Sequence, residues 1–89
     1  MRSIGSAEFW RLYSALPPRI KTAARAAYRK FKRNPAHPGL SLERLRRSQR
    51  LWSVCITLDY RAVAARTEGD FWLWVWIGSH KDLERKFGP

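Results

Sequence analysis

The sequence predicts an α/β (α+β) domain: an N-terminal antiparallel helical hairpin packed on a mostly antiparallel four-stranded sheet, with a short C-terminal helix. Apolar residues recur at helical spacing before residue 34 and at a period close to two from Leu40 onward. Residues 34–39, between these halves, combine asparagine, proline and glycine and predict a rigid turn. At 89 residues, the chain is expected to form a single domain over residues 1–89.

Two helices are expected before this turn. Ser6 can cap the first helix, Pro17-Pro18 can end it and begin the second, and Asn34-Pro35 can stop the second. The link between the helices is so short that an antiparallel hairpin is the natural arrangement. The apolar stripe of the first helix consists of Phe9, Leu12, Tyr13 and Leu16, and that of the second of Ile20, Ala23, Ala24, Ala27, Tyr28 and Phe31.

Four strands are expected after the turn, at residues 40–43, 52–59, 61–66 and 71–77. The last strand is apolar on both faces, so we expect it to be central and covered on both sides. The hairpin can cover one face, which leaves the other for the C-terminal tail, a partner, or both. Ser79 can cap a final helix, with Asp82 completing a capping box. The faces of the last strand are predicted to carry Phe71, Leu73, Val75 and Ile77 on one side and Trp72, Trp74 and Trp76 on the other.

The charge of the chain is strongly positive, with 18 Lys and Arg against 7 Asp and Glu and a formal net charge of +11. Such an excess repels itself in a compact domain, and an anionic partner would relieve the repulsion. The phosphate backbone of nucleic acid is the first candidate, and an acidic protein, an anionic membrane surface or simple solubility are the alternatives. One cluster can bind an RNA backbone or form a merely solvated loop: Arg44, Arg46, Arg47 and Arg50.

Several classes of protein and site are excluded. The longest apolar stretch, residues 71–77, is too short to span a bilayer, and the first residues show no signal-peptide pattern, so we expect a cytoplasmic protein. The single cysteine, Cys55, allows no internal disulfide and is expected to be a buried small hydrophobe. His37, interpreted as structural, and His80 lie far apart without neighbouring carboxylates or thiols, so we expect no metal; no cofactor motif is present.

The remaining candidate chemistry lies in one histidine and nearby cations. At His80 and Lys81 the last strand ends and a helix is expected to begin, and a helix start offers free N–H groups and a positive dipole end to a phosphate. Arg61 follows the turn into the third strand, where it can grip a phosphate through two parallel hydrogen bonds. The plainer alternatives are a histidine that packs at a strand end and an arginine that is solvated or salt-bridged.

Several local strings, taken in order, resemble those of small toxins in the RelE/ParE superfamily. They are Phe9-Trp10 with Leu16-Pro17, Tyr28-Arg29-Lys30-Phe31 running into residues 34–40, Trp52-Ser53-Val54, Tyr60-Arg61-Ala62-Val63, and Trp76-Ile77-Gly78-Ser79-His80. The resemblance covers nearly the whole chain and implies the toxin of a type II toxin–antitoxin system. It also implies a cognate antitoxin, which we expect to be acidic and partly disordered. This partner would cover the basic face or the face bearing Trp72, Trp74 and Trp76, three residues for which a core role is the alternative.

The resemblance implies one of two targets. RelE-like members cut mRNA, usually on the ribosome, without a metal, whereas ParE-like members poison DNA gyrase and lack the nuclease residues. By position, Arg61 and His80 resemble the catalytic cations of the nucleases. Lys81 and the arginine cluster would then bind the RNA backbone. We therefore predict a ribosome-dependent mRNA endoribonuclease that arrests translation and growth, with a gyrase-directed toxin or a non-toxic RNA-binding module as alternatives.

Some positions depart from the nuclease pattern. Ser53 and Cys55 stand where the resemblance would place lysines, Leu83 stands where a tyrosine often follows, and Phe87 has no hydroxyl. The nuclease prediction also requires Arg61 to lie on the same side of the sheet as the helix start. The sequence leaves this open, because a turn one residue longer or shorter moves a strand residue to the opposite face.

Overall fold

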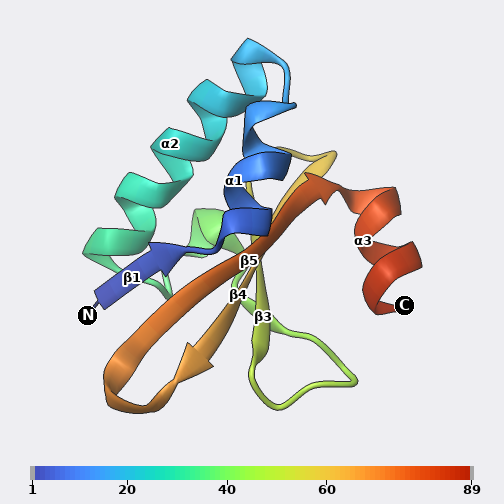
Figure 1. The fold of residues 1–89 in the computed structure, drawn as a ribbon. Helices are drawn as coiled ribbons and strands as arrows, with labels where there is room; N and C mark the ends of the chain where they lie inside the picture. Colours follow the sequence, from blue (N-terminus) through green and yellow to red (C-terminus); the bar gives the residue numbers. More distant parts are fainter. Residues whose placement is uncertain (1, 89) are drawn as a thin grey trace.

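The computed structural model describes residues 2–88, and this part of the chain contains three α-helices and one five-stranded sheet (Figure 1). The helices are α1 (Ala7–Ser14), α2 (Pro18–Arg33) and α3 (His80–Phe87). The strands are β1 (Arg2–Gly5), β2 (Glu43–Arg44), β3 (Leu51–Cys55), β4 (Tyr60–Thr67) and β5 (Phe71–Ser79). Two short 3-10 turns, η1 (Pro38–Leu40) and η2 (Glu68–Asp70), precede β2 and β5. The sheet order is β1-β5-β4-β3-β2, with β1 parallel to β5 and the other pairs antiparallel.

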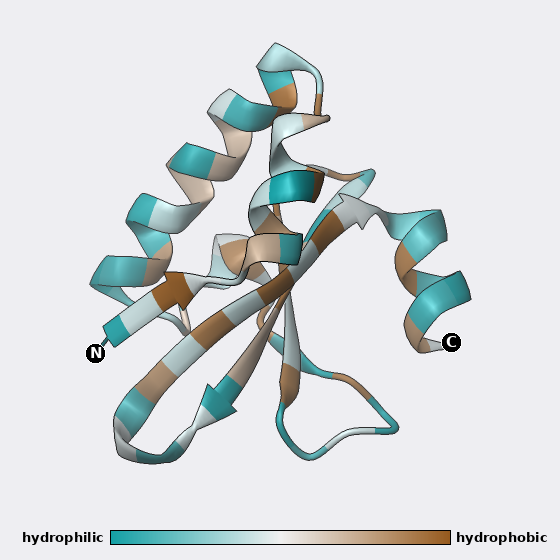
Figure 2. Cartoon of the chain, viewed as in Figure 1, coloured by the Kyte–Doolittle hydropathy of each residue, from teal (hydrophilic) through white to brown (hydrophobic). Residues whose placement is uncertain are grey.

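The α+β class, the helical hairpin and the C-terminal helix are confirmed, and two of the helices begin at the predicted caps. Ser6 accepts a hydrogen bond from the backbone N–H of Phe9, and Ser79 accepts one from that of Asp82, each at 3.1 Å. Pro18 begins α2, because a proline at the first helical position loses no hydrogen bond. Figure 2 shows hydrophilic residues recurring along α2 and α3, as expected for helices at the surface of a domain.

The sheet contains one strand, β1, that the sequence analysis did not predict. It forms an edge of the sheet beside β5, with Arg2 opposite Phe71 and Gly5 opposite Trp74. Its residues alternate between exposed and half-buried, and Ile4 is 57% exposed. So short an edge strand carries little hydrophobic pattern of its own, and its pairing with the apolar β5 defines it.

The strand predicted at residues 40–43 is largely wrong. Leu40 is buried at the end of η1, and Ser41 adopts a left-handed conformation with φ of 46°, so no extended strand begins there. The observed strand is the two-residue β2. The next predicted strand is correct in position but ends at Cys55, because residues 56–59 already turn back toward β4.

A bulge in β5 changes the predicted assignment of its faces. Val63 pairs with Trp76 but Ala64 pairs with Trp74, so Val75 is an extra residue in β5. The alternation of side chains is therefore interrupted at this point. Trp72, Trp74 and Ile77 share one buried cluster, whereas Trp76 belongs to a second cluster. The prediction that all three tryptophans share a face is wrong for Trp76.

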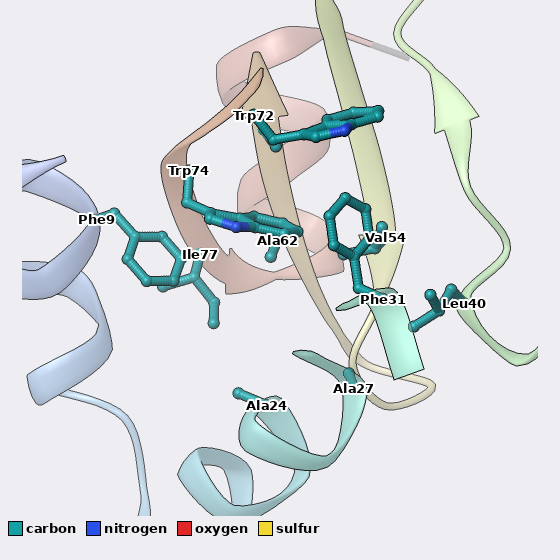
Figure 3. Packing of buried hydrophobic residues seen from close by; sticks show 11 residues of the cluster. Phe9, Ala24, Ala27, Phe31, Leu40, Val54, Ala62, Trp72, Trp74 and Ile77 are labelled. Atoms are coloured by element: carbon teal, nitrogen blue, oxygen red, sulfur yellow. The ribbon is translucent and has the colours of Figure 1, made fainter. Parts of the chain in front are cut away.

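Helices cover both sides of the sheet, as expected for a strand such as β5 (Figure 1). On the hairpin side, the ring of Phe31 packs edge-on against Trp72 and Trp74, at centroid distances of 5.1 and 5.0 Å (Figure 3). On the other side, Leu83 of α3 closes over Trp76 and its neighbours. The tail therefore covers the second face, as the sequence analysis allowed. None of the described helices is both long and apolar enough to cross a membrane.

Candidate functional site

The strand register places Arg61 on the α3 side of the sheet. Arg61 pairs with Cys55 on β3 and with Gly78 on β5. Because side chains alternate along a strand, Arg61 points to the same face as Val63, which belongs to one buried cluster with Leu83 of α3. The sequence left open on which face of the sheet Arg61 lies. The structure places it on the α3 side, which is the side that the nuclease prediction requires.

The guanidinium group of Arg61 is held by the turn between β3 and β4. Its Nη1 donates to the carbonyl oxygen of Thr57 at 2.7 Å and also reaches those of Tyr60 and Leu58, at 3.2 and 3.3 Å. The same atom lies 3.4 Å from Sγ of Cys55. Among residues 2–88, every hydrogen bond of this side chain uses Nη1, which leaves the N–H groups of Nε and Nη2 for a ligand. Arg61 is thus both a clamp on the turn and an oriented donor.

His80 stands beside the same turn, at the first residue of α3. Its backbone N–H donates to the carbonyl oxygen of Asp59 at 2.7 Å, which ties the helix start to the segment that Arg61 clamps. Its Nε2 lies 2.8 Å from Oε1 of Glu84, and the imidazole is 45% exposed. Glu84 was not predicted from the sequence, although its i, i+4 spacing from His80 on a predicted helix was the available signal. This contact occupies Nε2 and leaves Nδ1 for a ligand.

The structure therefore brings Arg61 and His80 to one corner of the molecule, where the β3–β4 turn meets the start of α3. The two residues are linked through the turn: Arg61 binds the Thr57 carbonyl and His80 binds the Asp59 carbonyl. Lys81 follows on the exposed surface of α3. The backbone thus places a guanidinium, an imidazole and an ammonium group at the start of α3, with the carboxylate of Glu84 against the imidazole. Arginine and a helix start are both groups that can bind a phosphate.

The positions that depart from the nuclease pattern add no charge to this corner. Ser53 is buried, at 9% exposure, and Leu83 is buried beneath α3. Cys55 is only half-buried, so its interpretation as a buried hydrophobe needs correction: its thiol donates to the carbonyl oxygen of Thr57 at 3.2 Å. Phe87 packs edge-on against Trp76, at a centroid distance of 5.7 Å. None of these four side chains brings a cation to the corner.

The predicted arginine cluster divides into separate places. Arg44, Arg46, Arg47 and Arg50 are all exposed. Arg47 reaches the C-terminal end of α3, since a Cβ built on Gly88 would lie 3.7 Å from its Nε, and a cation is favoured there by the helix dipole. Arg50 lies instead at the start of β3, opposite the end of β4. His37 has the structural role expected for it, because its Nδ1 accepts a hydrogen bond from the N–H of Gly39 at 2.9 Å.

The three tryptophans predicted to bind an antitoxin belong to the core. Trp72, Trp74 and Trp76 are 2%, 7% and 6% exposed, so they offer a partner almost no surface. The core alternative raised in the sequence analysis describes their position. The indole N–H groups of Trp72 and Trp74 are buried without a hydrogen-bond partner among the described residues.

An apolar groove lies between the hairpin, β1 and the sheet, over Trp74. Its volume is about 420 Å³, and Ala24, Phe31 and Ile77 contribute to its lining. Three large side chains around it remain exposed: Ile4 at 57%, Trp10 at 53% and Tyr28 at 36%. Arg25 and Arg29 of α2 are also part of the lining. A groove of this kind, apolar inside and basic at its edge, is typical of a protein-binding surface.

No group of three or more potential metal ligands is found among residues 2–88. At the candidate corner, the imidazole of His80 contacts the carboxylate of Glu84 on the same helix.

Comparisons with known proteins agree with this architecture. A family model described as ParE-like toxin domain matches residues 18–85. No curated protein sequence matches the chain. Similar solved structures include a YoeB/ParE toxin from Agrobacterium tumefaciens, with a TM-score of 0.72 and 21% identity over 90% of this chain and 99% of that one. They also include the RelB–RelE antitoxin–toxin complex from Methanococcus jannaschii, with a TM-score of 0.70 and 13% identity over 94% and 98% of the two chains.

A metal-bound toxin from Helicobacter pylori is a further structural relative, with a TM-score of 0.62 and 15% identity over 93% of this chain and 98% of that one. At these identities the structural likeness shows a shared fold alone. The family model carries the assignment, because it spans both α2 and the whole of the sheet from β2 to β5. The chain therefore belongs to the ParE-like toxin domain family, within the RelE/ParE toxin superfamily.

Proposed function

We propose that this toxin domain is a metal-free endoribonuclease that cuts ribosome-bound mRNA, with the scissile phosphate held at the corner of Arg61 and His80. The observation that carries the proposal is the anchored guanidinium of Arg61. Its Nη1 is fixed by turn carbonyls, so the Nε and Nη2 donors are oriented before a ligand arrives. An oriented donor pair is the arrangement that stabilises charge building on a phosphate.

The reaction uses groups that this corner supplies. The 2′-hydroxyl oxygen bonds to the adjacent phosphorus as the bond to the 5′-oxygen breaks, giving a cyclic phosphate and a free 5′-hydroxyl. Arg61 donates to the non-bridging oxygens, on which negative charge grows. His80, with Nε2 on Glu84, offers Nδ1 for one of the two proton transfers, and solvent takes part in the other. Lys81 adds a fixed charge for the backbone.

The second candidate is a toxin that acts on DNA gyrase without cutting RNA. The observation that favours it is the neutral character of the strand beside Arg61. Ser53 and Cys55 share the face of Arg61 but bring no cation, and Leu83 is buried where the resemblance suggests a tyrosine. On this reading, Arg61 serves only as the clamp of the turn.

Induced expression in a bacterial host, followed by mapping of mRNA 5′ ends, separates the candidates. The nuclease proposal predicts growth arrest with cuts inside translated codons. His80→Ala and Arg61→Gln should abolish both effects, whereas Arg19→Gln, which removes an exposed arginine from α2, should keep them. Because Arg61 also holds the turn, His80→Ala is the decisive variant, and circular dichroism should show its fold intact. Growth arrest with a DNA-damage response and no RNA cuts would favour the gyrase candidate, and absence of any growth effect would favour a non-toxic RNA-binding module.

We also propose an acidic, partly disordered antitoxin as the partner of this chain, docked in the apolar groove rather than on the buried tryptophans. One structural relative is itself an antitoxin–toxin complex. Exposed Ile4 and Trp10 offer apolar contacts, and Arg25 and Arg29 offer charges complementary to an acidic segment. Co-purification of the chain with the product of a neighbouring reading frame at mild salt tests the partner. Recovery of the toxin alone under those conditions would count against it.

A further inference from the structure

A second groove, whose lining includes two arginines and one glutamate, lies at the end of β3 and β4 that is far from Arg61. A groove of about 690 Å³ is lined there by Gln49, Arg50, Trp52, Arg66, Thr67 and Glu68. Trp52 pairs with Ala64, which belongs to the core cluster on the hairpin side, so Trp52 and Arg66 point to that side. Arg61 points to the α3 side. The groove is therefore separate from the candidate nuclease corner in both face and position.

Two arginines stand opposite each other at this groove. The backbone N–H of Arg66 donates to the carbonyl oxygen of Arg50 at 2.8 Å and so extends the β3–β4 ladder by one step. Like charges directly opposite on neighbouring strands are destabilising. Arg66 is partly compensated by Asp70 at 3.7 Å and by its position over the ring of Trp72. Among residues 2–88, the side chain of Arg50 has no hydrogen bond or ion pair, so an anion between the arginines would relieve the repulsion.

Trp52 provides a flat apolar surface beside these charges. Its indole is half-buried and packs edge-on against Trp72, with centroids 6.4 Å apart and ring planes at 73°. Trp52 also lines the groove. Its neighbour on β4, Ala64, carries only a methyl group, and its neighbour on β2, Arg44, adds a third cation to this face. An aromatic surface flanked by cations is how proteins bind the base and phosphate of a single-stranded nucleic acid.

We propose that this groove binds one nucleotide of single-stranded RNA, with the base stacked on Trp52 and the phosphates between Arg50 and Arg66. Glu68 and Gln49 at the rim offer polar groups to the edge of the base. The identity of the ligand as RNA rests on the proposed function, but the site itself does not depend on cleavage. An acidic protein segment would satisfy the arginines without using the indole, and the test distinguishes it.

The test uses a fluorescently labelled hexanucleotide that is 2′-O-methylated throughout and therefore cannot be cut. Its affinity for the full chain is measured by anisotropy over a range of salt concentrations. Arg50→Gln should weaken binding and lower the slope of log affinity against log salt by about 0.7, the value for one phosphate contact on a single strand. Arg19→Gln is the matched control, because it removes an exposed arginine from α2 and should leave the slope unchanged.

Stacking is tested with hexanucleotides that lack one base at successive positions. In the native chain, removing the stacked base should weaken binding about 5- to 150-fold, the range expected for one base on an aromatic ring. Trp52→Leu keeps an apolar contact with Trp72 but should abolish that dependence on position. A flat response in the native chain, or equal effects of Arg50→Gln and Arg19→Gln, would overturn the proposal. A flat response that remains sensitive to Arg50→Gln would indicate a site for charge alone, such as an acidic protein segment.

These outcomes are independent of the nuclease proposal. If Arg50→Gln and Trp52→Leu weaken hexanucleotide binding but no mRNA cuts occur in cells, the groove proposal stands and the nuclease proposal is refuted. Cuts that persist in Arg50→Gln and Trp52→Leu, together with unchanged hexanucleotide affinity, would refute the groove and leave the nuclease in place.

Discussion

Trp76 packs so closely against Gly78 that the change Gly78→Ala should disturb the way α3 is held. A Cβ added at Gly78 would lie 2.7 Å from Cζ2 and 2.9 Å from Cη2 of Trp76, which is closer than carbon atoms pack in proteins. The backbone of Gly78 cannot simply move away, since it pairs with Arg61 in the sheet. The indole must turn instead, and it then loses its edge-on contact with Phe87 of α3.

The expected cost follows from this geometry. Overpacking in a well-packed core destabilises by about 1–3 kcal/mol. For a domain of this size each kcal/mol lowers Tm by roughly 4–8 °C, so Gly78→Ala should lower Tm by about 4–24 °C. Thermal unfolding followed by circular dichroism measures the shift, and tryptophan fluorescence reports the movement of the indole.

A double-mutant cycle shows whether the clash is the cause. Trp76→Leu alone leaves a cavity beneath α3, whereas in the Gly78→Ala background it also removes the clash. The two changes should therefore be non-additive, with the second costing less in the presence of the first. Additive losses, or a Gly78→Ala protein with unchanged Tm, would refute the claim that Trp76 fills the space beside Gly78.

Three further predictions concern the cap, the groove and the clamp. Ser79→Ala removes the acceptor for the Asp82 N–H and should cost about 0.5–2 kcal/mol in urea unfolding, whereas Ser14→Ala, outside any N-cap, should cost less. Ile4→Ser should weaken antitoxin binding at least about tenfold, as expected for an interface anchor, and calorimetry measures the change. The control Leu58→Ser changes an 85% exposed residue outside the groove and should not weaken binding. Equal effects of the two changes would contradict the docking site. Arg61→Gln removes the hydrogen bonds that hold the β3–β4 turn and should speed amide exchange at residues 57–60, and unchanged exchange would disprove the clamp.

Much of the fold could be predicted from the sequence, because several signals are strong and local. Ser6, Pro18 and Ser79 define helix ends by satisfying or sparing backbone donors, and the structure confirms all three. The two-faced apolar pattern of residues 71–77 correctly indicated a strand covered on both sides. Signals of this kind depend on neighbours within one or two turns of the chain.

The errors occurred where structure depends on distant partners. β1 forms because it can pair with the edge of β5, and the four residues of β1 carry no local pattern that would predict this pairing. The bulge at Val75 depends on how β5 fits β4, so the separation of Trp76 from the other tryptophans could not be read from alternation. From the sequence, the side chain of Arg61 could be assigned to one of two faces of the sheet. The hydrogen bonds from its Nη1 to the β3–β4 turn could not be predicted, because they depend on the conformation of that turn.

The parallel pairing of β1 with β5 has a consequence for synthesis of the chain. β1 must wait for β5, the strand beside it, which is synthesised after both hairpin helices and after β2, β3 and β4. Contacts between such distant segments are slow to form, so the sheet closes late. Until β5 is in place, the apolar stripe of α2 lacks its tryptophan partners. The nascent chain therefore exposes apolar surface that chaperones, or an antitoxin made beforehand, could bind.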